Sequence, residues 1–179
     1  MITIRPGSHV HTLILLLSFV GEFPMSSLHL LGSVRSYKDL IRKLNQEQEF
    51  RFADTDLRLT CRLLTVSGKK KYKTVRFHKS ALPLLQTFEG RAYQYYLDTF
   101  RDHSFSGNQN HVDRNHRIAE TALMCMKAGI EARPTEVAYL MSAEVRNLQV
   151  QKPFFYLARE LKQVNAYELN KIRFTRLAG

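Results

Sequence analysis

Apolar positions recur at helical spacing near the start of the chain. Between His9 and Val20 they follow one another three or four residues apart, which places them on one face of an α-helix. The stripe consists of Val10, Leu13, Ile14, Leu17 and Val20. Ser8 is suited to cap this helix at its N-terminus, and Gly21 is suited to end it. The pattern therefore predicts a buried first helix.

Two more helices are predicted directly after the first. Pro24 is suited to open a short helix over Met25–Leu31, which Gly32 closes. A third helix is expected from about Ser36 to Gln46. Its buried face is expected to hold Tyr37, Leu40, Ile41 and Leu44. Because Tyr37 belongs to this stripe, we expect its ring to be buried rather than to contact a ligand.

The period of the apolar positions then changes from helical to alternating. Leu57–Val66 is rich in β-branched and apolar residues, which is typical of a strand. Ser67 and Gly68 form a turn signal, and Tyr72–His78 is expected to be the returning strand. A short helix is expected over Ser80–Phe88. The sequence thus predicts three helices, a β-hairpin and a further helix.

Three helices followed by a β-hairpin are the elements of a winged helix, a variant of the helix-turn-helix. We therefore predict an α+β protein with an N-terminal winged helix (three helices plus a β-hairpin wing) over residues 1–88. Residues 89–179 are predicted to form a mainly helical region with a few strands. Because the chain stops at Gly179 directly after a strand-like segment, this second domain is expected to be incomplete at its C-terminus.

The second region has its own pattern. Phe88–Arg101 is predicted to be an aromatic-rich helix, and its tyrosines are expected in the core, with a partner surface as the alternative. Asp113 is predicted to cap a long helix that runs to about Ala128 and ends at Gly129. The remaining expected elements are a helix over Pro134–Glu144 and strands over Pro153–Leu157 and Ile172–Phe174.

The composition narrows the class of protein. The chain has 27 Lys plus Arg against 16 Asp plus Glu, a net charge of +11 and a pI near 9.9. Such an excess attracts a polyanion, usually nucleic acid and less often an anionic membrane. The two cysteines, Cys61 and Cys125, match no metal spacing and no disulfide framework, which fits a reducing compartment. We therefore expect a cytoplasmic protein.

Thr12–Val20 is apolar in the manner of a secretory signal, but no typical cleavage site follows it. The run is also too short to span a bilayer as a helix. A buried first helix is the favoured interpretation, and no membrane association is predicted.

The basic residues are concentrated after residue 61. From residue 62 to 79 there are seven Lys or Arg and no acid. The residues expected to bind DNA phosphates here are Lys69, Lys70, Lys71 and Lys73 at the hairpin tip and Arg76 on the returning strand. An ammonium on a flexible stem suits phosphate as a point charge and selects no base. The alternative is a solvated hairpin tip that keeps an exposed edge soluble.

The outer face of the third helix is the second candidate DNA contact. Arg35, Ser36 and Lys38 lie at its N-terminal end, where a recognition helix meets base edges. Arg35 is the preferred base contact, because arginine can pair with guanine through two hydrogen bonds. Arg42 and Lys43 lie a turn later and are expected to reach phosphates.

Two further patterns suggest chemistry. His116 and Glu120 share a helix face, but a metal site would need another ligand such as His111, and this spacing is more typical of surface neighbours. Glu160 and Lys162 have the E-x-K spacing of metal-dependent nucleases, which is short and common by chance. We therefore predict no catalytic residue, no metal site and no cofactor. Enzymatic activity stays open, with a non-enzymatic role favoured.

The whole pattern resembles the replication-relaxation family, winged-helix proteins of bacterial plasmids and integrated mobile elements. The resemblance is carried by the winged-helix order, by His116-Arg117-Ile118-Ala119-Glu120 opening a helix, and by Ala128-Gly129-Ile130. Weaker similarities are Phe155-Tyr156, Glu160-Leu161-Lys162 and Arg176-Leu177-Ala178-Gly179. The resemblance implies a role in replication, transfer or regulation of a mobile element.

The predicted function is therefore binding of double-stranded DNA in replication, transfer or transcriptional control of a plasmid or mobile element. A metal-dependent DNA nicking enzyme and a winged-helix adaptor that binds another protein are the alternatives. A homodimer stays open, because no sustained heptad marks a dimer seam.

Overall fold

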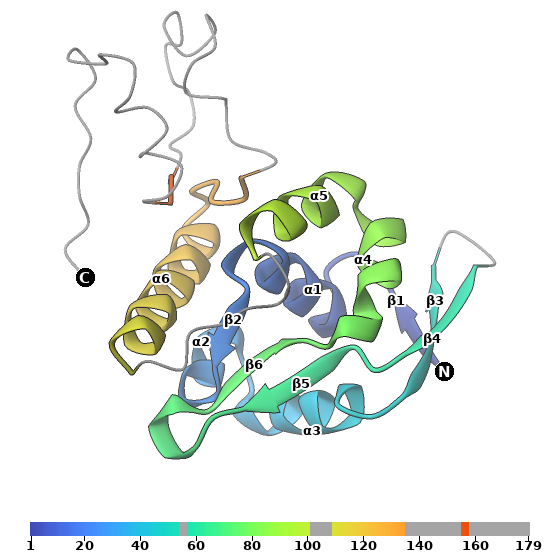
Figure 1. Ribbon diagram of the computed structural model, residues 1–179, viewed down its shortest axis with the longest axis horizontal. Coiled ribbons are helices and arrows are strands. Elements are labelled where there is room, and N and C mark those ends of the chain that lie inside the picture. Colours follow the sequence, from blue (N-terminus) through green and yellow to red (C-terminus); the bar gives the residue numbers. More distant parts are fainter. Residues whose placement is uncertain (54–56, 101–108, 135–154, 158–179) are drawn as a thin grey trace, which may run out of the picture. The chain divides into compact units, whose positions relative to one another are not determined.

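A computed structural model of the chain describes residues 1–53, 57–100, 109–134 and 155–157 (Figure 1). These residues contain six α-helices and two small three-stranded sheets, so the protein is α+β, as predicted. Contacts divide the chain into two compact units, Met1–Glu120 and Thr121–Gly179. The domain boundary predicted after residue 88 lies inside the first unit, between α4 (Leu82–Phe88) and α5 (Gly90–Thr99).

Helix α1 (His9–Val20) forms the centre of the first unit. Ser8 caps it by accepting a hydrogen bond from the His11 backbone N–H, and Gly21 ends it at a φ of 81°. A Cβ atom at Gly21 would lie 2.5 Å from the Phe100 ring, so only glycine fits there without a shift. The apolar stripe of α1 is fully buried, which confirms the predicted first helix. Among the described residues, no helix is long and apolar enough to cross a bilayer.

One sheet follows α1 in the order β2-β6-β5, with β6 (Thr74–Phe77) in the middle and antiparallel to both neighbours. Strand β2 (Glu22–Pro24) comes directly after α1, and β5 (Leu64–Ser67) joins β6 through a lysine-rich turn. The segment between β2 and β5 contains the 3₁₀ turn η1 (Met25–Ser27) and the helices α2 (Leu28–Leu31) and α3 (Val34–Leu44).

Pro24 ends β2 and is also the N-cap residue of η1, so Met25–Leu31 is helical over its predicted range, as a 3₁₀ turn followed by the four-residue helix α2. Helix α3 begins two residues earlier than expected, since Ser33 caps it, and it ends at Leu44. The returning strand is also shorter than Tyr72–His78, because the 3₁₀ turn η2 (Lys70–Tyr72) precedes it.

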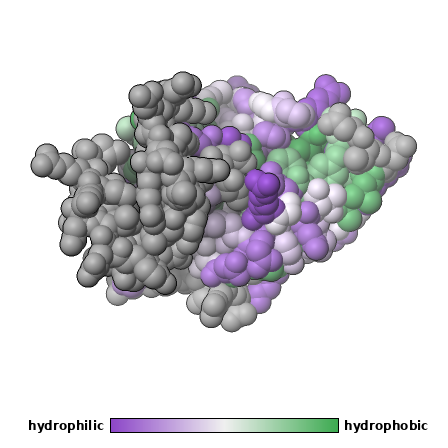
Figure 2. Space-filling model, turned by 90° about the horizontal axis from the view of Figure 1, so that it is seen from above, coloured by the Kyte–Doolittle hydropathy of each residue, from purple (hydrophilic) through white to green (hydrophobic). Residues whose placement is uncertain are grey.

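The second sheet has the order β1-β3-β4 and was not predicted. Strand β1 (Ile2–Ile4) runs parallel to β3 (Gln48–Phe52), which pairs antiparallel with β4 (Arg58–Cys61). Figure 2 shows apolar residues gathered toward the end of the molecule where β1, β3 and α4 lie. Exposed Met1 and Leu57, which precede β1 and β4, contribute apolar surface to the protein.

The single strand predicted over Leu57–Val66 is wrong. Its first part is β4 and its last part is β5, and these strands belong to different sheets. At the break, the Arg62 backbone N–H donates to Ser80 Oγ at 3.2 Å, and the Leu63 carbonyl accepts from the His78 N–H at 3.0 Å. Both parts alternate in hydropathy, so the pattern alone did not reveal the break.

Helices α4 and α5 also belong to the first unit, and α5 packs against α1. Tyr96 of α5 is fully buried, and its ring meets Phe77 edge to face at 5.4 Å between centroids. Burial raises the Tyr96 pKa, which the nearby Arg76 charge partly opposes. For Tyr96, the predicted core position is therefore confirmed.

Helix α6 spans Gln109–Lys127 and ends near Gly129, which has a φ of 76°. The predicted N-cap at Asp113 is wrong, because Asp113 lies inside this helix and a cap residue needs non-helical backbone. Phe155–Leu157, the described part of the strand predicted over Pro153–Leu157, is not a strand, although the Phe155 N–H donates to the Glu131 carbonyl at 2.7 Å. The elements predicted over 135–144 and 172–174 lie outside the described residues.

Candidate nucleic-acid interface

Helix α3 packs against the rest of the first unit with one of its faces. Tyr37, Ile41 and Leu44 are buried, as predicted, while Leu40 is only partly buried. The Tyr37 ring stacks on His9 with 4.6 Å between centroids, and its hydroxyl lies 3.4 Å from His9 Nδ1. Burial raises the Tyr37 pKa. This packing turns the opposite face of α3 to solvent.

That exposed face carries the predicted helix contacts. The exposed residues are Arg35, Ser36, Lys38, Arg42 and Lys43. A shallow depression on this face is lined by Val34, Arg35, Lys38, Asp39 and Arg42. Asp39 and Arg42 form an ion pair at 3.0 Å. The surface is therefore cationic with one acid in it.

Arg62 fixes the position of α3 relative to the sheet β2-β6-β5. Its Nη2 donates to Asn45 Oδ1 at 2.8 Å, directly after the end of α3, and its Nε donates to the Leu64 carbonyl at 3.2 Å. In the sequence, Arg62 was recognised only as the first member of the run of basic residues from 62 to 79. Its hydrogen bonds give it a structural role, which the residue type alone did not indicate.

The turn between β5 and β6 presents the lysines, and we call Lys69–Lys73 the lysine turn. Gly68 precedes it with a φ of 79°, and a Cβ atom there would lie 2.1 Å from the Tyr72 carbonyl oxygen. Lys70 also has a positive φ, of 51°. The four lysines are exposed. The turn is therefore built to hold cations in solvent.

Within the lysine turn, Lys71 Nζ lies 4.9 Å from the centre of the Tyr72 ring. A hydrogen bond to Tyr72 and the Asp113 carboxylate raise the Lys71 pKa. The turn is anchored from behind, since the Met25 N–H donates to the Lys73 carbonyl at 2.8 Å. Lys71, like any exposed lysine, is positively charged at neutral pH.

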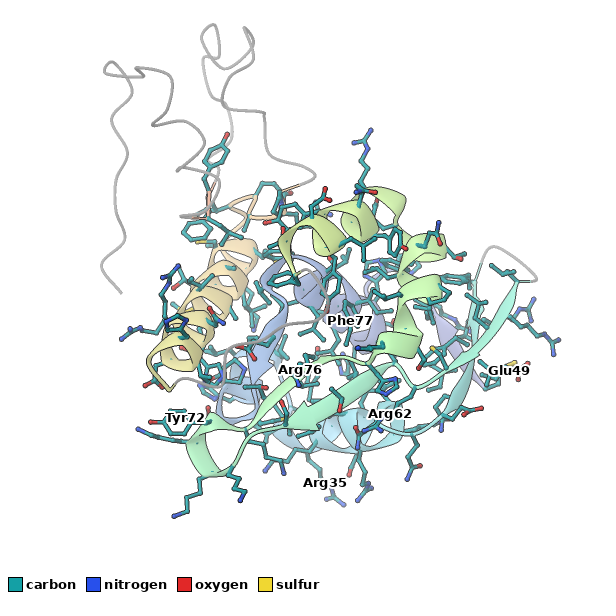
Figure 3. All side chains as sticks on the ribbon, in the orientation of Figure 1. Arg35, Glu49, Arg62, Tyr72, Arg76 and Phe77 are labelled. Carbon is teal, nitrogen blue, oxygen red and sulfur yellow. The ribbon has the colours of Figure 1, made fainter. Side chains whose placement is uncertain are left out.

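The structure brings two of the predicted groups to one side of the molecule. In Figure 3, Arg35 extends from α3 toward the same lower side on which the lysine turn lies. Arg76 is not part of this group. It is partly buried in the middle of β6, opposite Glu22 of β2, and near Tyr96 of α5.

A second group of polar side chains lies between α6 and the start of β2-η1, and we call it the buried polar cluster. Its members are Glu22, Ser27, Asn115, His116 and Glu120. Asn115 Nδ2 donates to Glu22 Oε1 at 2.9 Å, and Ser27 Oγ donates to Glu120 Oε1. Glu22 is 3% exposed and His116 is 7% exposed.

His116 Nε2 is buried and has no hydrogen-bond partner among the residues that the structure describes. Burial lowers the His116 pKa, and the carboxylates of Glu22, Glu120 and Asp113 oppose this shift. In the described part of the chain, no three His, Cys, Asp or Glu side chains are placed to hold a metal ion. His111, the third ligand considered for a metal site, is exposed on α6.

The residues considered for nuclease chemistry, Glu160 and Lys162, lie outside the described residues. Comparison of the chain with protein-family models, with curated proteins and with solved structures finds no match. The features of the structure that bear on function are the two basic surfaces, the exposed face of α3 and the lysine turn, whose side chains offer hydrogen-bond donors and positive charge to an anionic partner.

Proposed function

We propose that this chain binds duplex DNA as a winged-helix protein. One observation carries the proposal: the exposed cationic face of α3 and the lysine turn lie on the same side of the first unit (Figure 3). The order α1, β2, α2, α3, β5, β6 and the sheet order β2-β6-β5 also support it, since helices followed by a hairpin wing are the parts of this fold. The hairpin β3–β4 is then an insertion before the wing.

In this proposal α3 enters the major groove, and the lysine turn contacts the flanking phosphates. A major groove of about 12 Å admits one α-helix. Lysine ammonium groups bind phosphate without reading sequence, so the turn supplies affinity and register. Arg35 lies in the first turn of α3, where recognition helices contact base edges. The two surfaces thus have separate roles in affinity and in preference.

We further propose that this binding serves replication, transfer or transcriptional control of a plasmid or mobile element. The support for this step is the sequence resemblance to the replication-relaxation family.

The test is the binding of purified protein to random-sequence duplex DNA across a salt series, followed by fluorescence anisotropy. We expect micromolar or tighter binding at low salt and a steep loss of affinity as salt rises, since bound lysines release counterions. Replacing Lys69, Lys70 and Lys71 by alanine is expected to weaken binding of all sequences about 100-fold and to flatten the salt dependence by about 0.9 per lost phosphate contact.

The matched control replaces exposed Arg5, Arg58 and Arg91 by alanine, which removes the same charge from other surfaces. This control is expected to keep most of the affinity. Equal losses in the two triple variants would reduce the lysine turn to a general charge effect. No binding by the wild-type protein at low salt would refute DNA binding and favour a protein-binding adaptor.

A further inference from the structure

The exposed face of α3 contains one acid, and its position is unusual for a surface that only holds phosphates. Asp39 lies in the depression between Arg35, Lys38 and Arg42. A carboxylate repels phosphate oxygens, so it lowers affinity for a DNA backbone. The ion pair with Arg42 does not explain why an acid is present at position 39, because this pair does not stabilise the fold appreciably. Its side chains are 55% and 79% exposed, and such ion pairs contribute little to folding.

Helical geometry places Asp39 where a base edge would lie. Arg35 and Asp39 are four residues apart, so they follow each other along one ridge of the helix about 6 Å apart. One base step is about 3.4 Å, so two such side chains reach base pairs one or two steps apart. Val34, at the N-terminal end of the same depression, is apolar and 38% exposed. An apolar side chain suits a base edge better than a phosphate.

We propose that Asp39 is a specificity-determining residue, which accepts a hydrogen bond from the N4 amino group of a cytosine and turns phosphate away from this part of α3. The inference rests on the proposed DNA binding and adds the base that the helix selects. A carboxylate has only acceptors to offer, and cytosine is the base whose major-groove edge offers only a donor.

Asp39 has a second effect in this arrangement, because it holds Arg42. The guanidinium Nη2 donates to Asp39 Oδ1 at 3.0 Å in the free protein. Cytosine binding by Asp39 places Arg42 beside the same base pair, and Arg35 one turn away remains available for guanine. The preferred site therefore contains a cytosine one or two base pairs from a guanine read by Arg35.

The experiment is selection from a random duplex library with the full chain, using wild-type protein, Asp39→Asn and Glu49→Gln. Asn is nearly isosteric with Asp but pairs with adenine. We expect Asp39→Asn to replace the selected cytosine by adenine, with a change of about tenfold in relative affinity for the two sites. Its affinity for unselected DNA is expected to rise, since one negative charge is lost.

Glu49→Gln is the matched control. Glu49 forms a similar exposed ion pair with Arg58, at 3.5 Å, and Figure 3 places it on β3, well away from Arg35. The control loses the same charge and is expected to select the wild-type site.

Two results would overturn the assignment of Asp39. In the first, Asp39→Asn selects the same sequences as the wild type; in the second, it gains affinity equally for all sequences. If the wild-type protein binds DNA and the triple lysine variant binds it more weakly, either of these two results refutes only the role of Asp39 and leaves the proposed DNA binding intact. If the wild-type protein enriches no sequence and has no affinity for DNA at low salt, the proposed function fails as well.

Discussion

The exposed face of α3 and the lysine turn, together called the basic surface, contain side chains similar to those of the buried polar cluster, but in the opposite environment. On the basic surface, Arg42 and Asp39 meet in water, where Coulomb attraction is weak and side-chain entropy opposes the pair. In the cluster, Glu22 is almost fully buried and accepts a hydrogen bond from Asn115 of α6. Removing a partner from a buried charge is costly, because water does not replace it. Exposed residues such as Arg42 are therefore available to a ligand, whereas buried residues such as Glu22 hold α6 in place.

The largest effect on stability is expected in the cluster. Asn115→Ala leaves the buried Glu22 carboxylate without the amide that donates to it, and we expect a loss of about 2 kcal/mol in the free energy of unfolding. Urea denaturation measures this loss. Gln94→Ala is the control, since Gln94 Nε2 makes the same kind of bond to Asp98 Oδ1, at 3.1 Å, in an exposed position on α5. Equal losses in the two variants would contradict the comparison.

A smaller effect is expected from pH. Burial lowers the pKa of His116 below its ordinary value of 6.5, so the unfolded chain binds this proton more readily than the folded chain. The contribution to stability is therefore complete above about pH 6.5 and is lost as pH falls toward the lower folded-state pKa. We expect His116→Gln to lose less stability than the wild type between pH 7 and about pH 5.

Urea denaturation at the two pH values provides the measurement for His116. His111→Gln, at an exposed position on the same helix, serves as the matched control. A His116→Gln variant with the same pH-dependent loss as the wild type would show that other groups cause it.

The smallest effect on stability is expected on the basic surface. Arg42→Ala breaks the exposed pair with Asp39, and we expect the free energy of unfolding to change by less than about 0.5 kcal/mol. Thermal and urea denaturation both measure the free energy of unfolding well enough to detect a change larger than this. A loss comparable to that of Asn115→Ala would mean that the exposed pair stabilises the fold after all.

Helical periodicity predicted the parts of the fold that depend on local sequence. Helices α1 and α3 and the lysine turn are close to their predicted positions, because caps, apolar stripes and turn residues all lie within a few residues of each other. Strands β1 and β2 are three residues long, too short for a period to show. Strand β3 does alternate and pairs with nearby β4, so a local signal was present, whereas its pairing with β1, more than forty residues earlier, has no local signal.

The candidate site divides in the same way. The exposed face of α3 follows from its buried stripe, so the cations opposite Tyr37 and Ile41 could be named from sequence. Arg62 and Arg76 belong to the same basic run as the lysines, yet Arg62 is bonded to Asn45 and Arg76 lies opposite Glu22. Only the fold distinguishes them. The buried polar cluster joins partners 93 residues apart, which no spacing rule finds.

The two cysteines make site-specific labelling of the protein straightforward. Cys61 and Cys125 are both buried, and burial raises the pKa of each thiol, to about 11 for Cys61, where the Glu47 carboxylate adds to the effect. Maleimides react with the thiolate, which is scarce at neutral pH when the pKa is this high. A cysteine introduced at exposed Ser26, beside the residue that anchors the lysine turn, would therefore take up a fluorophore ahead of the native thiols. The wild-type background is thus already suited to a dye that reports on this surface.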